Sequence, residues 1–364
     1  MFKVFANRNF IEGVLINQTP KIWYNIFMSG NVAEICVPED MNDECIGSMG
    51  ANDVFDSLQL FGTIIKTSAD YINEIPLNSH LVLDNPNAVF LLNIKPEEAE
   101  TIQKYYGVIC QSFDALDDDI LTKAYEFNLY DGEKGVDWSV FFNKRIHTIP
   151  SNALIICDRY IFCVDRNKPG EDDVQKAIDL GLSNIRGILN SILPRRYNDV
   201  YNVLIAFDSS KLIQSEAQEM KLFKYIAEKL RDYAEENKKS RYYKIHFDLI
   251  SIDKTCLNYK KLHNRRIIGN YFLVRADYKL RAFNNNVSTA TQTIFYDALF
   301  SKVFPMTPSG PDSPIKSQLQ TIEYIQEIIL NGKCRKYTSF EDKQEITVTD
   351  DCKTCTNRLI INNS

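Results

Sequence analysis

The chain has 364 residues, of which 45% are hydrophobic and 25% are charged, and its formal net charge is −6. This length exceeds what one hydrophobic core usually serves, so two domains are expected. The ordinary balance of residue types predicts a globular protein, and the net charge excludes a chain that is basic throughout. We expect no membrane span, because no run of about 18 apolar residues occurs.

Two further features of the composition bear on location. The first eight residues hold no long apolar segment, so we expect no secretory signal. The nine cysteines are odd in number, and four of them lie in apolar surroundings: Cys36, Cys110, Cys157 and Cys163. Such cysteines are typical of reduced thiols rather than of a disulfide framework, which predicts a cytoplasmic protein.

Residues 1–150 are expected to form an acidic N-terminal domain of α/β or α+β class. Short strands are predicted at 23–28, 32–37, 80–84 and 88–92, and a helix is predicted from Pro96. Between residues 22 and 65 there is no Lys or Arg, but there are seven acidic residues: Glu34, Glu39, Asp40, Asp43, Glu44, Asp53 and Asp56. They are interpreted as a solvated acidic face, or as a surface that docks a basic protein partner or mimics nucleic acid.

From residue 152 onward, strands alternate with long helices. Strands are predicted at 153–164, 201–207 and 243–252, and helices at 172–193 and 216–233. This alternation predicts right-handed crossovers and a mostly parallel sheet, so residues 151–306 are expected to form a second α/β domain. Further strands are predicted at 266–273 and 278–283. Residues 307–364 are expected to hold a linker, a helix at 315–330 and a small Cys-containing hairpin.

Positive charge is concentrated in one part of this otherwise acidic chain. Between residues 254 and 281, Asp277 is the only acid, and eight residues are cationic: Lys254, Lys260, Lys261, Arg265, Arg266, Arg275, Lys279 and Arg281. Clustered Lys and Arg suit phosphate, so nucleic acid is the expected partner, bound by Lys260, Lys261, Arg266, Arg275, Lys279 and Arg281. Five aromatic residues lie among them: Tyr259, Tyr271, Phe272, Tyr278 and Phe283. These rings either stack on bases or alternate into the core of two strands.

One short pattern within this stretch carries chemistry. It reads His263-Asn264-Arg265, then four residues, then Asn270. The spacing resembles the His-x-Lys-x4-Asp motif of the phospholipase D superfamily, over roughly residues 150–290. The resemblance implies an α/β sandwich in which His263 attacks phosphorus and forms a phosphohistidine, while Arg265 holds phosphate oxygens. Asn270 stands where the family has its aspartate.

The resemblance also bears on assembly. The superfamily completes one site from two copies of the motif, whereas this chain has one copy. A complete site would therefore require a homodimer that brings two His263 side chains together. On this basis we expect a phosphodiesterase that acts on nucleic acid without metal or cofactor, in a bacterial defence or accessory system. The alternative is a catalytically inactive module on the same scaffold that binds nucleic acid or a protein.

Two smaller groups of residues complete the candidates. Asp208 and Asp253 should each follow the carboxyl end of a parallel strand, where they could hold a metal, orient His263 or cap the next segment. Cys334, Cys352 and Cys355 are spaced C-x17-C-x2-C, and no fourth Cys or His follows them. They are interpreted as free thiols in a terminal hairpin or as part of a zinc site completed from elsewhere.

Overall fold

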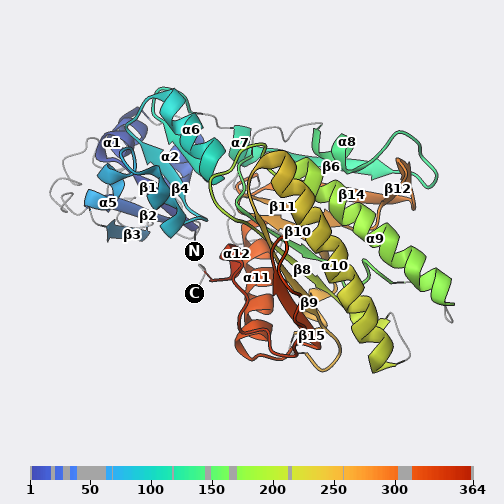
Figure 1. Cartoon of the computed structure of the whole chain (residues 1–364). Helices are drawn as coiled ribbons and strands as arrows, with labels where there is room; N and C mark the ends of the chain where they lie inside the picture. The colour runs from blue at the N-terminus through green and yellow to red at the C-terminus, as the bar shows by residue number, and fades with distance from the viewer. Residues whose placement is uncertain are drawn as a thin grey trace.

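The computed structural model describes residues 2–17, 21–27, 33–38, 63–67, 69–116, 119–143, 149–163, 170–211, 215–256, 258–301 and 314–361. Within these ranges the chain forms two α/β units, each built around its own sheet (Figure 1). The α/β class is therefore confirmed. None of the helices described has the length and apolar character needed to cross a membrane.

The smaller unit is built on five parallel strands in the order β3-β2-β1-β4-β5: β1 (Phe2–Ala6), β2 (Ala33–Pro38), β3 (Thr63–Thr67), β4 (Val89–Leu92) and β5 (Ile109–Ser112). Successive side chains of a strand point to opposite faces of the sheet, and in these strands the side chains on both faces are largely apolar. Val4 packs with α1 (Arg8–Asn17) and α2 (Lys21–Phe27). Phe5 points to the other face, which is covered by α5 (Ala69–Glu74) and α6 (Pro96–Tyr106).

Two of the predicted strands in this unit are wrong. Residues 23–27 belong to helix α2, and residues 80–84 lie in the 3-10 helix η1 (Ser79–Asp84). The buried side chains of α2 are Ile22, Trp23, Ile26 and Phe27, a spacing that fits one face of a helix. The strands predicted near 32–37 and 88–92 and the helix from Pro96 are confirmed as β2, β4 and α6.

The larger unit is built on an eight-stranded sheet in the order β15-β9-β8-β7-β10-β11-β14-β6. Its strands in chain order are β6 (Ala124–Leu129), β7 (Ala153–Cys157), β8 (Tyr201–Phe207), β9 (Ile245–Ser251), β10 (Arg265–Gly269), β11 (Phe272–Ala276), β14 (Gln292–Ala298) and β15 (Lys336–Phe340). A separate pair is formed by β12 (Phe283–Asn284) and β13 (Val287–Ser288).

The expectation of a mostly parallel sheet is wrong for this unit. Strands β7, β8 and β9 are parallel, as predicted, but the other neighbouring pairs described are antiparallel. The predicted strand 266–273 is in fact two strands, because the chain reverses at Asn270 and Tyr271 between β10 and β11. A link of two residues can join only antiparallel neighbours.

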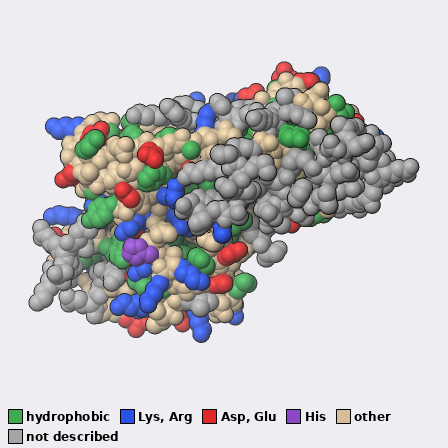
Figure 2. All heavy atoms as spheres, turned by 180° about the vertical axis from the view of Figure 1, so that it is seen from behind, with side chains coloured by type: hydrophobic (Ala, Val, Ile, Leu, Met, Phe, Trp, Pro, Cys, Tyr) green, Lys and Arg blue, Asp and Glu red, His purple; other side chains and the backbone are tan. Residues whose placement is uncertain are grey.

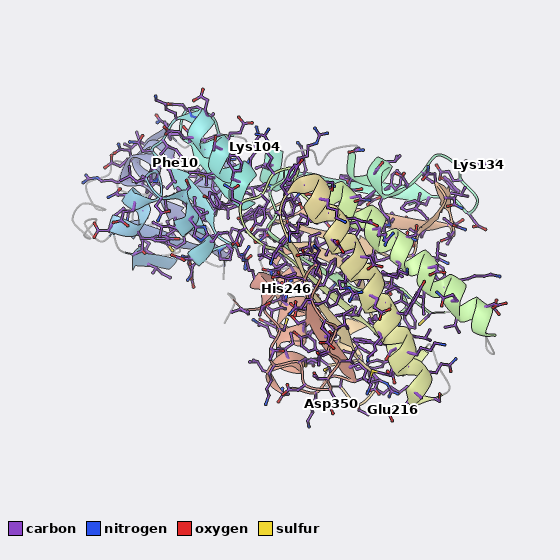
Figure 3. The ribbon with its side chains drawn as sticks, viewed as in Figure 1. Phe10, Lys104, Lys134, Glu216, His246 and Asp350 are labelled. Atoms are coloured by element: carbon purple, nitrogen blue, oxygen red, sulfur yellow. The ribbon has the colours of Figure 1, made fainter. Side chains whose placement is uncertain are left out.

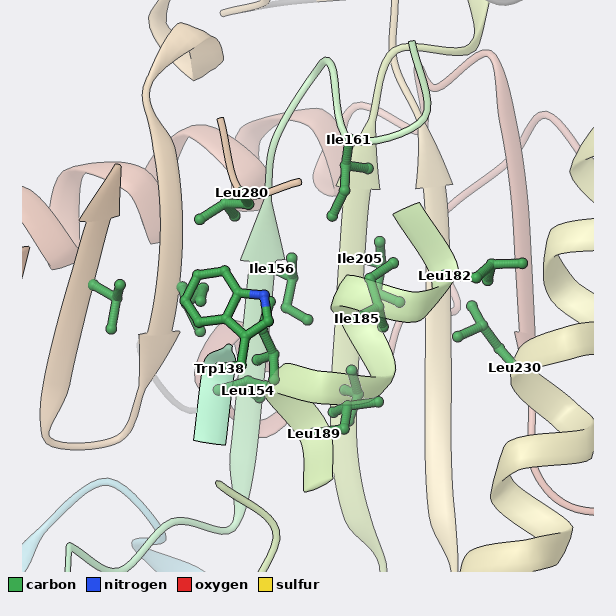
Figure 4. Close-up of a cluster of buried hydrophobic side chains, with 14 of the residues drawn as sticks. Trp138, Leu154, Ile156, Ile161, Leu182, Ile185, Leu189, Ile205, Leu230 and Leu280 are labelled. Atoms are coloured by element: carbon green, nitrogen blue, oxygen red, sulfur yellow. The ribbon is translucent and has the colours of Figure 1, made fainter. Parts of the chain in front are cut away.

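Helices cover both faces of the parallel part of this sheet. On one face, α9 (Glu171–Ile192) and α10 (Glu216–Arg241) share a hydrophobic core with Leu154 and Ile156 of β7, as shown in Figure 4. On the other face, α11 (Pro314–Leu330) and α12 (Arg358–Ile361) pack against Ile155 of the same strand. Both faces of β7 are thus buried, which explains its unbroken apolar run.

The boundary between the units lies earlier than residue 150. Strand β6 and helix α8 (Trp138–Asn143) belong to the larger unit, so the change of unit falls between the end of β5 and the start of β6. The C-terminal part is not separate either. Strand β15 is the edge of the large sheet, and α11 covers one of its faces.

The two units share a hydrophobic core. Tyr271 and Phe300 of the larger unit pack edge-on against the ring of Phe2, with ring centroids 5.8 and 5.5 Å away. The Tyr271 hydroxyl donates to the carbonyl of Ala88 at 2.6 Å and accepts the N–H of Ile109 at 3.1 Å. The larger unit therefore completes the core of the smaller one.

Candidate nucleic-acid interface

Three aspartates lie at the carboxyl ends of the three parallel strands of the larger unit. Asp158 follows β7, Asp208 follows β8, and Asp253 lies two residues beyond β9. All three are buried, with 0%, 1% and 8% of their surface exposed. The positions expected for Asp208 and Asp253 are thus confirmed. Asp158 was not predicted, although the same rule about strand ends would have found it.

Each of these carboxylates is engaged in local structure. Asp208 accepts hydrogen bonds from the N–H of Ser210 at 3.0 Å and from the hydroxyl of Tyr259 at 2.5 Å. Asp253 accepts the N–H of Thr255 at 2.8 Å and pairs with Arg335 at 2.9 Å. The interpretation that they cap the following segment is confirmed. Among the described residues, no group of three or more His, Cys, Asp or Glu could hold a metal ion.

Asp158 is used in the same way. It accepts the N–H groups of Tyr160 and Leu280 at 2.8 and 3.0 Å. Burial raises the pKa of this carboxyl, and the two hydrogen bonds and the nearby cations Arg265 and Arg281 oppose that rise. These bonds hold the turn after β7 in place, and that turn positions Tyr160.

His263 and Arg265 both contact one tyrosine ring. His263 ends the 3-10 helix η3 (Lys261–His263), is exposed, and meets the ring of Tyr160 edge-on with 5.7 Å between centroids. The guanidinium of Arg265, the first residue of β10, lies 5.5 Å from the centroid of the same ring. The imidazole and the cation are therefore presented together at an accessible edge of the sheet.

The surroundings of His263 favour its neutral form. Desolvation lowers the pKa of His263, and the positive charges of Arg265 and Arg159 lower it further. Arg159 is buried, with its guanidinium stacked 3.6 Å from the ring centroid of Tyr259. His263 makes no hydrogen bond or ion pair with any residue that the structure describes. No described carboxylate therefore orients the ring in the way that a nucleophilic histidine would need.

Asn270, the third residue of the predicted site, lies at the opposite end of β10. Five extended residues separate it from the histidine end, which corresponds to roughly 15–20 Å. Asn270 is buried and accepts the N–H of Asn152 at 3.0 Å, while it donates to Asn87 at 2.7 Å and to the carbonyl of Pro86 at 3.1 Å. Asn270 therefore joins the two units. It does not meet His263, because the extended strand β10 lies between them.

The predicted nucleic-acid-binding cations divide into two sets. Lys260 and Lys261 are exposed beside His263, and the Lys261 ammonium lies 4.5 Å from the ring centroid of Tyr324. Lys279, which is half-buried, lies 5.0 Å from the ring centroid of Tyr278. Figure 2 shows Lys and Arg side chains gathered on one face of the larger unit, with a histidine among them.

The remaining three arginines bond to partners within the protein. Arg266 donates to the carbonyl of Ser317 at 2.9 Å, because successive side chains of β10 point to opposite faces and Arg266 meets helix α11. Arg275 pairs with Asp297 at 2.9 Å. Arg281 is buried and donates to the carbonyl of Cys163. Arg281 is therefore enclosed by the protein, whereas Arg275 stays partly exposed while it pairs with Asp297.

The aromatic residues of this stretch are mostly core residues. Tyr259, Tyr271, Phe272 and Phe283 are buried, and Tyr278 is exposed. The interpretation that these rings alternate into the core is confirmed for the four buried ones. The ring that serves the site is Tyr160, which sequence reasoning missed. Its position directly after the turn at the end of β7 was the available signal.

A cleft of about 1180 Å³ lies at the other edge of the sheet, between α6 of the smaller unit and α8 and α9 of the larger one. Arg195 and Arg196 line it; both are exposed, and neither pairs with a residue in the described ranges. Lys104 of α6, labelled in Figure 3, also lines the cleft and pairs with Glu100 at 2.5 Å. The cleft is a second place where positive charge is accessible.

The acidic segment predicted to dock a protein lies largely outside the described residues. Glu34 is part of β2, but Glu39, Asp40, Asp43, Glu44, Asp53 and Asp56 fall in ranges that the structure does not describe. In comparisons with known proteins, no family model matches the chain and no curated protein matches it.

Proposed function

We propose that this chain is a non-catalytic module that binds nucleic acid through the phosphate backbone. The contact surface is the basic edge, which we define as Lys260, Lys261, His263 and Arg265. One observation carries the proposal: these accessible side chains are basic or neutral, while the carboxylates at the same edge are buried and engaged in internal bonds. The outward face therefore offers positive charge to an anion.

The geometry around His263 supports binding rather than catalysis. A histidine that attacks phosphorus works best when a second group fixes its orientation, and the residue expected to help, Asn270, lies at the far end of β10. Neighbouring cations favour the neutral imidazole, which can donate one hydrogen bond to a phosphate oxygen.

The same geometry predicts the kind of recognition. The ring of Tyr160 is already contacted by His263 and Arg265, so it is not offered to a base. Contacts to phosphate alone carry no sequence information. Binding should therefore depend little on sequence and strongly on salt.

The experiment uses the full chain and a fluorescent 20-nucleotide single strand, titrated by anisotropy at several salt concentrations. The test variant replaces Lys260, Lys261 and Arg265 with Gln. We expect an affinity loss of about 10- to 100-fold and a salt slope reduced by about 2, because three phosphate contacts are removed. The matched control replaces Arg195 and Arg196 with Gln, at the other edge of the sheet.

The two variants separate the possible outcomes. Wild-type affinity in the basic-edge variant would refute the proposal. A loss of affinity confined to the control variant, with Arg195 and Arg196 replaced, would place the nucleic acid in the cleft beside α6 instead. Duplex DNA and RNA are titrated in parallel to define the class of nucleic acid.

A second candidate function is the phosphohistidine phosphodiesterase. The observation that favours it is the exposure of His263 beside Arg265, which leaves the ring accessible to a second copy of the chain across a two-fold axis. Cleavage of labelled DNA or RNA in the presence of chelator, abolished in His263→Ala, would replace the non-catalytic proposal. Binding of the nucleic acid without cleavage would support the proposal of a non-catalytic module.

A further inference from the structure

We propose that the cleft beside α6 binds a small organic phosphate, a molecule with two or more phosphate groups on an uncharged polar body. The cleft lies between the two units and measures about 1180 Å³. Pockets for small molecules measure about 300–1,000 Å³ and often lie between domains, so a nucleoside triphosphate fits, whereas a lone phosphate would leave most of the space empty. The inference does not rest on the nucleic-acid proposal, because the basic edge is at the opposite edge of the sheet.

Two arginines line the cleft on a segment that is anchored at both ends. Arg195 and Arg196 are exposed, and neither has a partner among the residues that the structure describes. They lie between Leu193 and Tyr197, which are both buried. The backbone that carries the two guanidinium groups is therefore held in place before a ligand arrives, which reduces the entropy lost on binding.

The end of helix α9, which leads into this segment, does not offset the positive charge. The last carbonyls of a helix carry partial negative charge, which would repel an anion. Here the Arg241 guanidinium donates to the carbonyls of Leu193 at 2.5 Å and of Asn190 at 3.3 Å. The hydroxyl of Tyr243 donates to the carbonyl of Pro194 at 2.8 Å. These carbonyls are thus satisfied within the protein.

A further cation comes from the smaller unit. The N–H of Asn198 donates to the carbonyl of Tyr105 at 2.9 Å, which ties the arginine segment to the end of α6. Lys104, the residue before Tyr105, lines the cleft and pairs with Glu100 at 2.5 Å. Both side chains of this pair are exposed, and such pairs contribute little, so Lys104 can exchange Glu100 for a phosphate.

The charges in the cleft favour an anion with several phosphates. The described residues that line it include the acids Glu100 and Asp137, and Asp137 already accepts the N–H of Val140 at 2.7 Å at the start of α8. A guanidinium donates two parallel hydrogen bonds to phosphate oxygens. Two neighbouring guanidinium groups and an ammonium group therefore suit a diphosphate or triphosphate.

The rest of the lining suits an uncharged body. The described residues that line the cleft from α8, α9 and the hairpin of β12 and β13 include no charged side chain. Asn285 and Asn286 are exposed at the turn of this hairpin, which lies far from α6 in Figure 1. Their amide groups suit the hydroxyl groups and ring nitrogens of a nucleoside. A nucleic-acid strand requires positive charge along its whole path, so charge at one end favours a small molecule.

The test titrates the full chain by isothermal calorimetry with the four ribonucleoside triphosphates, inorganic tripolyphosphate and the corresponding nucleosides. We expect at least one triphosphate to bind with Kd below about 1 mM. Tripolyphosphate should bind more weakly, because it lacks the body that contacts the amide groups. The corresponding nucleoside should bind at least about 10-fold more weakly than its triphosphate, because it makes no contact to the arginines.

Two variants locate the bound triphosphate. Arg195→Gln combined with Arg196→Gln should weaken triphosphate binding by about 10- to 100-fold and leave the nucleoside affinity unchanged. The matched control combines Lys221→Gln with Lys224→Gln, which removes the same charge from the exposed face of α10 and should bind the triphosphate as wild type does. All four side chains are exposed, so both variants should keep the wild-type Tm.

Four results would overturn the proposal. The first is that no triphosphate binds, and the second is that the arginine variant binds the triphosphate with wild-type affinity. The third is a nucleoside that binds as tightly as its triphosphate. The fourth is a loss of affinity for a 20-nucleotide single strand, and not for a triphosphate, in the arginine variant, which would assign the cleft to nucleic acid.

Discussion

At the scale of single residues, His263 couples the charge of the basic edge to pH. Desolvation and the charges of Arg265 and Arg159 lower its pKa below the ordinary value of 6.5, so the ring is neutral at pH 7. A bound phosphate would favour the protonated ring, so its pKa in the complex is higher than in the free protein. Binding therefore takes up a proton when the pH lies between these two values.

From this we predict that affinity for a single-stranded oligonucleotide rises as the pH falls from about 7 to about 5, the range in which a histidine titrates. The replacement His263→Gln should abolish this rise and leave the affinity at pH 8 nearly unchanged, since the ring is neutral there. Anisotropy titrations at constant ionic strength measure both values. An equal rise in His263→Gln would show that another group titrates.

The sequence was informative about some residues of the site and misleading about others. The strand-end rule located Asp208 and Asp253, because it depends only on the order of strands. Spacing alone grouped His263 with Asn270, but spacing does not say whether the intervening residues are extended, and here they form β10. The contacts of Asn270 with Asn87 and Asn152 could not be foreseen, because they join segments more than 100 residues apart.

At the scale of elements, the turn from α6 to β5 depends on a close approach between backbones. Gly107 ends α6 with φ of 61°, in the left-handed region. A Cβ at this position would lie 2.3 Å from the carbonyl oxygen of Ser151, just before β7 of the larger unit. The side chain of Asn152 donates to the carbonyl of Tyr106 at 3.3 Å in the same place. Only glycine satisfies both the conformation and the contact.

We predict that Gly107→Ala destabilises the protein by about 2–5 kcal/mol, from left-handed strain and from the backbone clash together. Gly132 provides the control, because it also has a positive φ, of 75°, and a Cβ there would meet no atom within 4 Å. Gly132→Ala should lower the free energy of unfolding only by the left-handed strain, about 1–2 kcal/mol. Urea unfolding measures both, and equal losses would contradict the role of the contact.

The elements themselves were predictable to different degrees. Helices α9 and α11 and strands β8 and β9 follow from clear apolar periodicity and lie close to where they were expected. Helix α2 was mistaken for a strand because seven residues are too few for the helical period to be distinguished. The antiparallel half of the large sheet was missed because residues 266–273 were taken as one strand, although Gly269-Asn270 is a pair typical of tight turns between antiparallel strands.

At the scale of the whole molecule, the two units should unfold together. The hydroxyl of Tyr271 bonds to Ala88 and Ile109 of the smaller unit, and its ring packs on Phe2. Removal of the Tyr271 hydroxyl therefore affects both units at once. Such a substitution tests whether the two units unfold together.

We predict that Tyr271→Phe lowers the stability by about 1–3 kcal/mol, because a buried N–H and a buried carbonyl lose their partner. Thermal unfolding should keep a single transition at a lower Tm. Tyr278→Phe, at an exposed tyrosine, should leave Tm almost unchanged. Two separated transitions in Tyr271→Phe would mean that the units are held together by this contact alone.

The shared core also constrains the order in which the chain folds as it leaves the ribosome. The last strand of the smaller unit ends at Ser112. Phe2 of this unit packs against Phe300, which is synthesised roughly 190 residues after Ser112. At ordinary translation rates this delay is about 10–40 s. Throughout that interval the nascent smaller unit carries an open apolar face, which makes it a natural client for a chaperone that shields hydrophobic surface.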